Sequence, residues 1–218
     1  MTIADVLSGT TDVVSGFSRT PAAGIVLAGG KSTRMGTSKA LLPFGPETML
    51  QRVVRILGGV VSPIVVVAAP GQELPALPAD VLRTQDEREG RGPLEGIRAG
   101  LKALPEEVEA AYITSCDVPL LVPGFVVEML DLARGYDIAV MEIDGFPHPL
   151  SAIYRRSVLP HVEDLLAHDR LRPFFLFERV QTRRVKPEEI AADRGLRTLR
   201  NLNTQGDYQQ ALAEAGLT

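Results

Sequence analysis

The sequence predicts an α/β fold, a single-domain three-layer α/β/α sandwich around a mostly parallel, Rossmann-like sheet. From Ala22 onward, short apolar segments alternate with amphipathic segments of helical period, a pattern typical of parallel sheets covered by helices. The chain has 218 residues, of which 45% are hydrophobic. This length suffices for one large core and is short for two independent cores.

The first two thirds of the chain supply most of the predicted sheet. Helices with one apolar face are expected at Thr48–Leu57 and Pro93–Leu104, where aliphatic residues recur every three or four positions. Strands are expected at five apolar runs: Gly24–Leu27, Ile64–Ala68, Val81–Thr84, Tyr112–Ser115 and Ile138–Ile143. In a sheet of this kind, ligands bind beyond the carboxyl ends of the strands.

After Phe146 the alternation weakens, because prolines interrupt it. A short strand is expected at Ser151–Tyr154 and helices at Pro160–Ala167 and Pro173–Val180. Thr204, with Asp207 three residues later, predicts a capping box that opens a final helix ending at Ala215. Residues 1–21 are rich in Ser, Thr and Gly and predict a flexible N-terminal extension ahead of a domain over 22–218.

Composition excludes several functional classes. The formal net charge is -4, which does not favour bulk binding to nucleic acid or to an anionic membrane surface. The single cysteine, Cys116, excludes an internal disulfide and a cysteine-based metal site within one chain. No apolar run reaches the roughly 18–20 residues that span a bilayer, and Asp5 and Asp12 precede the first strand in place of a basic leader. A cytoplasmic protein is expected.

The segment Leu27 to Leu42, read as LAGGKSTRMGTSKALL, predicts a phosphate-binding loop. It follows an apolar strand, and paired glycines let backbone N–H groups approach a ligand that a Cβ would exclude. Lys31, Arg34 and Lys39 supply positive charge, and the segment contains no carboxylate. The alternative is a Gly-rich surface turn with incidental basic residues.

Spacing excludes two better-known phosphate loops. A P-loop requires Lys directly after its second Gly, whereas Gly36 is followed by Thr37, and no G-x-G-x-x-G follows the first strand. The pattern L-A-G-G-x-S-x-R-M-G-x-x-K-x-L-L instead resembles the signature of nucleotidyltransferases that activate sugars and cofactors with a nucleoside triphosphate. Within that group, a loop with a double Gly rather than Ala-Gly is similar to the loop of the molybdenum-cofactor guanylyltransferase (MobA-like) family.

This resemblance implies a specific reaction. The enzyme would transfer GMP from GTP to molybdopterin with the help of Mg²⁺, releasing pyrophosphate and forming molybdopterin guanine dinucleotide. GTP and molybdopterin would be its substrates, and contacts with a molybdoenzyme or a cofactor-delivery protein are expected. Two alternatives stay open: a related nucleotidyltransferase that uses CTP on molybdopterin or a triphosphate on a sugar phosphate, and a catalytically silent nucleotide-binding regulator.

The resemblance also assigns residues to the nucleotide half of the site. Arg34, Lys39 and Asp117 are the expected catalytic residues, with Asp117 as the metal ligand at the end of a strand. The expected nucleotide contacts are Leu27, Ala28, Gly29, Gly30, Lys39, Asp86 and Asp117. A turn or helix-capping role before Pro119 would also account for Asp117, and an ordinary polar loop would account for Asp86.

The acceptor half of the site is expected to include Gly92, Gly96, His148, Asn201 and Asn203. Ordinary turn roles would also explain the asparagines, and packing between prolines would explain His148. The chain departs from the family at one place. Some members carry an Asn after the second strand that contacts the nucleotide, whereas this chain has Ala68, which offers no polar side chain.

Overall fold

The computed structural model describes residues 22–29 and 38–217. The expected N-terminal extension lies outside the described residues. So does the middle of the Gly-rich loop, residues 30–37, which includes Gly30, Lys31 and Arg34. The expected roles of those residues stay predictions.

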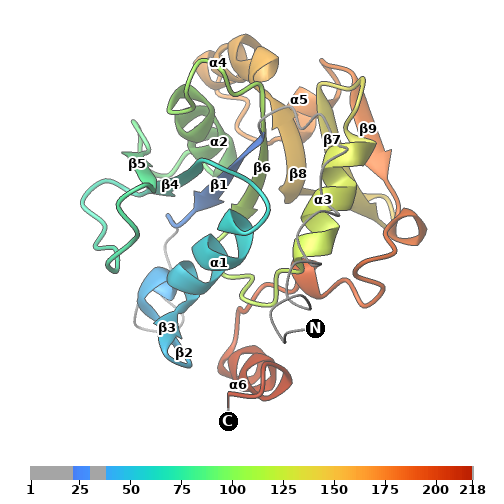
Figure 1. The fold of residues 1–218 in the computed structure, drawn as a ribbon. Coiled ribbons are helices and arrows are strands. Elements are labelled where there is room, and N and C mark those ends of the chain that lie inside the picture. Colours follow the sequence, from blue (N-terminus) through green and yellow to red (C-terminus); the bar gives the residue numbers. More distant parts are fainter. Residues whose placement is uncertain (1–21, 30–37, 218) are drawn as a thin grey trace, which may run out of the picture.

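The centre of the molecule is a seven-stranded sheet with the strand order β5-β4-β1-β6-β8-β7-β9 (Figure 1). Neighbouring strands pair in parallel except β8, which is antiparallel to both β6 and β7. The sheet is therefore mostly parallel, as predicted. Its strands are β1 (Ala22–Leu27), β4 (Ile64–Ala68), β5 (Leu82–Gln85), β6 (Ala110–Ser115), β7 (Ile138–Ile143), β8 (Phe146–Arg155) and β9 (Thr182–Val185).

Helices cover both faces of the sheet because the inner strands are apolar on both sides. One core contains Val26 of β1 together with the apolar faces of α1 (Met49–Gly58) and α3 (Pro123–Leu132). The other contains the neighbouring Ile25. Its helices are α2 (Pro93–Lys102), α4 (Leu159–Ala167) and α5 (Phe174–Phe177). Successive residues of a strand point to opposite faces, so these two cores confirm the predicted three layers (Figure 1).

The C-terminal helix, α6 (Gln205–Glu214), packs beside a short hairpin of β2 (Pro43–Phe44) and β3 (Glu47–Thr48). Phe44, Met49 and Leu202 are buried together in a small third core with Ala211 of α6. The predicted capping box is confirmed, since the Thr204 side chain accepts from Asp207 N at 3.1 Å. This packing brings the chain just before α6 back to the sheet.

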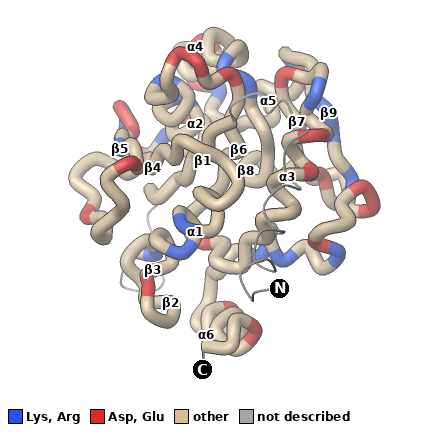
Figure 2. Tube along the Cα trace, in the orientation of Figure 1, with Lys and Arg blue, Asp and Glu red and all other residues tan. Residues whose placement is uncertain are grey.

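The edge strand β9 was not predicted from the sequence, and it is protected by charge. Its Arg183 and Arg184 are paired with Glu189 and Glu142 at 2.8 and 2.6 Å, so basic and acidic residues alternate along this side of the molecule (Figure 2). Charged side chains on an exposed edge oppose pairing with another chain. Because of these charged residues, β9 lacks the apolar run by which the other strands are predicted.

Three further elements differ from the prediction. Strand β8 begins at Phe146 rather than Ser151, and it accommodates two prolines next to an irregularity in its register with β7. Helix α5 is a single turn, shorter than the predicted Pro173–Val180. Helix α3 was missed because its first turn contains Gly124 and adjacent valines, which are weak helix formers.

Candidate active site

The carboxyl ends of β1 and β6 lie side by side, at the point where the strand order changes direction. From β1 the chain continues to β4 and β5 on one side, and β6 begins the other side. The two ends are joined by a hydrogen bond from Cys116 N to Leu27 O at 3.0 Å. Such a switch point is where open α/β sheets bind ligands, and here it brings the start of the Gly-rich loop next to Asp117.

Asp117 follows β6 and is held by its neighbours. Ser115, the last residue of β6, donates a hydrogen bond from its Oγ to Asp117 Oδ1 across the turn that follows the strand. Only 14% of the Asp117 side chain is exposed. The carboxylate therefore has a fixed direction at the strand end, which is what a metal or phosphate site requires.

Lys39 is the main partner of Asp117. It begins the short 3-10 helix Lys39–Leu41, directly after the Gly-rich loop. Its Nζ lies 2.8 Å from Asp117 Oδ2 and donates to Asn203 Oδ1 at 2.9 Å. Two segments that lie 78 and 164 positions from Lys39 along the chain thus meet at its ammonium group.

Asn203 reaches this position because the chain before α6 is anchored on Asp117. Leu202 N donates to Asp117 O at 3.0 Å, and Leu202 is buried. Asn203 N is bound by Asp207 of the helix cap at 3.1 Å. The structure places Asn203 against Lys39, and its expected contact with the acceptor stays a prediction. Asn201 is exposed two residues earlier.

The predicted nucleotide contacts at the end of β1 are packed tightly against β4. Ala28 N donates to Val67 O at 2.8 Å. A Cβ on Gly29 would lie 3.1 Å from Ala69 N, a tight contact with the backbone directly after β4 that favours glycine here. Leu27 and Ala28 are buried while Gly29 is exposed, which leaves the backbone of the loop's start facing outward.

Asp86 lies after β5, and its carboxylate is poorly satisfied. Asp86 Oδ1 is buried without a hydrogen-bond partner. Burial, and then the negative charge of Glu95, raise the pKa of Asp86 to about 6, although Arg98 opposes this shift. An unpaired buried polar atom is a place where a ligand could supply the missing hydrogen bond.

The structure gives the predicted acceptor residues different surroundings. Gly92 is exposed at the start of α2 with φ +71°. Gly96 is buried, and a Cβ there would come within 3.1 Å of Leu27 and 3.5 Å of Asp86 Oδ1. Gly96 therefore packs α2 against the end of β1, and its contact with the acceptor stays a prediction. His148 is half-buried in β8, and burial lowers its pKa.

The comparisons with known proteins agree on a family. A family model described as MobA-like NTP transferase domain matches residues 24–185. The chain belongs to this family. Two curated relatives are probable molybdenum cofactor guanylyltransferases. The relative from Mycobacterium tuberculosis H37Rv is 42% identical over 67% of this chain and 74% of its own length. The relative from Mycobacterium avium is 38% identical over 88% and 95%.

Solved structures share the fold of this MobA-like protein. Molybdopterin-guanine dinucleotide biosynthesis protein A from Archaeoglobus fulgidus has a TM-score of 0.74 at 20% identity, covering 90% of this chain and 100% of that chain. A Mycobacterium tuberculosis H37Rv protein solved in complex with manganese has a TM-score of 0.58 at 16% identity, covering 89% and 98%. The MobA-like protein is therefore an α/β enzyme of the nucleotidyltransferase class.

Within residues 22–29 and 38–217, no three His, Cys, Asp or Glu side chains are grouped to hold a metal ion. Helices of this part of the chain are too short or too polar to cross a membrane. Cys116 is buried, and burial raises the pKa of its thiol to about 12, which disfavours the reactive thiolate. A metal in the MobA-like site would need oxygen atoms from its substrates as well as from Asp117.

Sequence reasoning missed two polar residues at the site, Ser115 and Gln72. Ser115 could have been found by its position, since it is the polar residue that ends the predicted strand, two positions before Asp117. Gln72 lies in the loop after β4 and donates a hydrogen bond to Ala28 O at 2.9 Å. No motif or period marks it.

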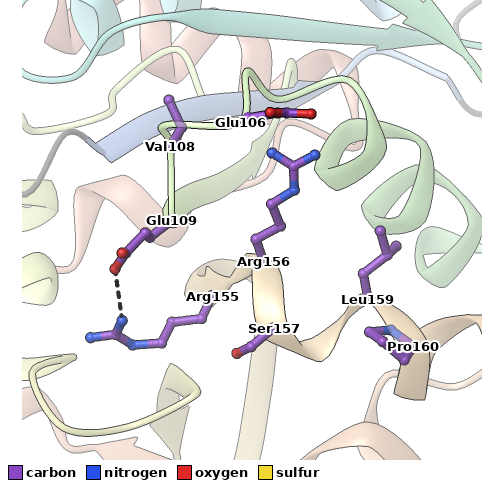
Figure 3. Close-up of a pocket in the computed structure, with 8 residues that line it drawn as sticks. All are labelled: Glu106, Val108, Glu109, Arg155, Arg156, Ser157, Leu159 and Pro160. Carbon is purple, nitrogen blue, oxygen red and sulfur yellow. Dashed lines mark hydrogen bonds and ion pairs between the residues drawn. The ribbon is translucent and has the colours of Figure 1, made fainter.

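A hollow also exists at the opposite, amino edge of the sheet (Figure 3). Arg155 and Arg156 from the end of β8 lie there beside Glu106 and Glu109. Arg155 donates to Tyr136 O at 3.0 Å, and Arg156 donates to Pro105 O at 2.8 Å. These guanidinium groups bind backbone carbonyls of the protein, so the hollow offers no convergent set of free groups.

Proposed function

We propose that this MobA-like enzyme transfers GMP from GTP to molybdopterin and releases pyrophosphate. The observation that carries the proposal is the Lys39, Asp117 and Asn203 cluster, which lies at the sheet's switch point next to the start of the Gly-rich loop. The names of the curated relatives and of the Archaeoglobus fulgidus neighbour support the same reaction.

The proposed reaction needs no nucleophile from the protein. An oxygen of the terminal phosphate of molybdopterin attacks the α-phosphorus of GTP, and the bond to the bridging oxygen of the β-phosphate breaks. Catalysis of such transfers depends mostly on positioning and on stabilising negative charge. Lys39 is suited to this task, because its ammonium group already lies at the loop's end and is only 18% exposed. Arg34 is proposed to assist it from the loop.

Asp117 fits a divalent cation that arrives with the substrate phosphates. Mg²⁺ usually takes one or two carboxylates and otherwise keeps phosphates and waters, and Asp117 offers one oriented carboxylate that already binds a cation, the Lys39 ammonium. The manganese complex of the fold neighbour supports divalent metal use. Mg²⁺ held by Asp117 would neutralise charge on the phosphates.

Binding of the triphosphate requires Lys39 to exchange partners. In the structure its ammonium is shared between Asp117 and Asn203. A triphosphate carries more negative charge than one carboxylate, so it competes for Lys39 and frees an oxygen of Asp117. Asn203, which can donate as well as accept, then stays close to both residues. We propose that it contacts the acceptor phosphate there, together with Asn201, Gly92 and His148.

The choice of base is the least constrained part of the proposal. Ala68 supplies no polar side chain at the end of the second strand, while the buried, unpartnered Asp86 Oδ1 offers an acceptor. Guanine has N–H groups that can donate hydrogen bonds to this oxygen. GTP is therefore the proposed source of the nucleotide, and Asp86 is proposed as one of its contacts. Use of CTP, or of a sugar phosphate as acceptor, is the alternative reaction. Contacts with a molybdoenzyme or a delivery protein in the cytoplasm are proposed from the reaction alone.

Turnover of the full chain with molybdopterin, Mg²⁺ and each of the four triphosphates tests the proposal. We expect pyrophosphate release with GTP, at least about tenfold faster than with the others, since a pocket that hydrogen-bonds one base edge leaves polar groups unpaired with another. Preference for CTP would assign the cytidylyl reaction. Binding of nucleotide without pyrophosphate release would assign the silent regulator.

A further inference from the structure

A carboxamide joins the two flanks of the Gly-rich loop. Gln72, four residues after β4, donates through Nε2 to Ala28 O at 2.9 Å and to Ser38 Oγ at 3.2 Å. Its Oε1 accepts from Ala69 N at 2.9 Å. Ala28 and Ser38 lie on either side of residues 30–37, the middle of the loop, so one side chain binds both flanks to the end of β4.

We infer that Gln72 is a positioning residue that sets the loop for the triphosphate. This inference rests on the proposed function. Gln72 acts through the backbone at Ala28 and through Ser38, which directly precedes Lys39. Fixing both flanks before the nucleotide arrives reduces the conformational freedom lost on binding. Ala28 and Ser38 are then held at a constant separation.

The chemistry of the position explains why a carboxamide is suited to it. The side chain must accept one hydrogen bond from a backbone amide and donate two others, and the carboxamide group provides both functions without charge. Glutamate cannot donate to Ala28 O, and a negative charge here would oppose a triphosphate. Leucine has a similar size but makes none of the three bonds.

The surroundings of Gln72 argue against a role in the core alone. It is half-buried in a turn, next to the exposed Gly71 with φ +71°. The backbone amide of Ala69, which donates to Gln72, also lies close to Gly29 at the start of the loop. We call the three hydrogen bonds of the Gln72 side chain the clamp. Loss of the clamp should therefore alter the order of the loop's flanks more than the stability of the fold.

Gln51 offers a matched control. Its side chain also accepts from a backbone amide, Thr48 N at 2.8 Å, and donates to a backbone carbonyl, Ala76 O at 2.8 Å. Ala76 belongs to the same long connection between β4 and β5 as Gln72. Gln51→Leu thus removes one bond to this connection without touching Ala28 or Ser38, and its other bond, to Thr48 N, is part of the α1 cap.

Steady-state kinetics of the full chain form the first test. Gln72→Leu should raise the KM for GTP about tenfold, because the two flanks would have to be ordered when the nucleotide binds, with kcat changed less than about threefold. The KM for molybdopterin should stay unchanged. Gln51→Leu should lower the melting temperature more than Gln72→Leu and leave the KM for GTP at the wild-type value. An equal rise in both variants overturns the inference.

Ser38→Ala tests the clamp through its second contact. It should raise the KM for GTP about twofold to threefold, and the double variant with Gln72→Leu should match Gln72→Leu alone, because Ser38 Oγ would have no partner left to lose. Additive effects would mean that the two residues act separately and would overturn the inference.

Amide hydrogen exchange without any substrate separates this inference from the proposed function. Exchange over residues 38–42 should be faster in Gln72→Leu than in the wild type and unchanged in Gln51→Leu. If the wild type turns over none of the four triphosphates, the proposed function fails, while faster exchange in Gln72→Leu would still support the clamp. Unchanged exchange in Gln72→Leu overturns the clamp whatever the substrate is.

Discussion

The carboxyl and amino edges of the sheet both carry basic side chains, but they use them differently. At the carboxyl edge, Lys39 binds Asp117 and Asn203, two side chains from distant parts of the sequence. At the amino edge, Arg155 and Arg156 are adjacent in sequence and donate to backbone carbonyls of neighbouring loops. In the first arrangement, a bound ligand is proposed to replace side-chain partners of Lys39. In the second, the arginines hold neighbouring loops at the amino edge of the sheet.

The comparison also separates shape from chemistry. The hollow in Figure 3 lies at the amino edge. The polar side chains that converge on one another, Lys39, Asp117 and Asn203, lie at the carboxyl edge. Asp86 adds a buried, unpartnered oxygen on the carboxyl side. Convergence of side chains from several strand ends is a better sign of an α/β active site than the depth of a depression.

Asp117→Asn should give the largest effect at the carboxyl edge. A neutral amide is a much poorer ligand for a hard cation, and losing one electrostatic contact of the transition state typically lowers kcat by a factor on the order of 10²–10³. Pyrophosphate release measured over a range of Mg²⁺ concentrations checks this. Asp131→Asn, at an exposed aspartate paired with Arg134, is the control and should keep full activity. A similar rate in both variants would remove Asp117 from the metal site.

Asp86→Asn should sharpen the comparison through the pH dependence of stability. The folded pKa of Asp86, about 6, lies above its ordinary value of 3.8 because burial and Glu95 disfavour the charge. The folded state therefore holds the proton more tightly, and this group's contribution to stability is lost as pH rises through about 6. Denaturation at pH 5 and pH 7.5 should show that the asparagine variant loses less stability than the wild type.

The expected difference for Asp86 is modest. The carboxyl group is only partly buried, so solvent screening limits the effect to about 1 kcal/mol. If the wild type and Asp86→Asn change equally between the two pH values, Asp86 is solvated in the folded protein. It would then no longer distinguish the carboxyl edge.

Much of the carboxyl edge could be predicted because strands and their ends leave local signals. The apolar runs before Gly29 and Asp117 placed both residues at one edge of a sheet, and the capping box at Thr204 predicted α6. The contact of Asn203 with Lys39 could not be predicted, since it joins positions 164 apart. It depends on how α6 packs against the β2–β3 hairpin.

Other features escaped because their sequence signals point elsewhere. Gln72 lies among Pro, Gly and polar residues, where no period distinguishes a clamp from an ordinary loop residue. Strand β9 carries two adjacent charged residues, Arg183 and Arg184, which are paired with Glu189 and Glu142, so its apolar content is low. In both cases the tertiary partner, which sequence does not reveal, determines the role.

Arg156→Ala should give the smallest effect on activity, and it tests the amino edge. The guanidinium group donates to Pro105 O at 2.8 Å, and a hydrogen bond of this kind contributes about 1 kcal/mol to stability. The free energy of unfolding should fall by about that amount, while kcat and KM stay within about twofold of the wild type. Chemical denaturation and pyrophosphate release on one preparation measure both. A large rise in the KM of either substrate, with stability unchanged, would mean that the hollow binds a ligand. Both edges would then be binding sites, and they would differ only in the ligand that each one binds.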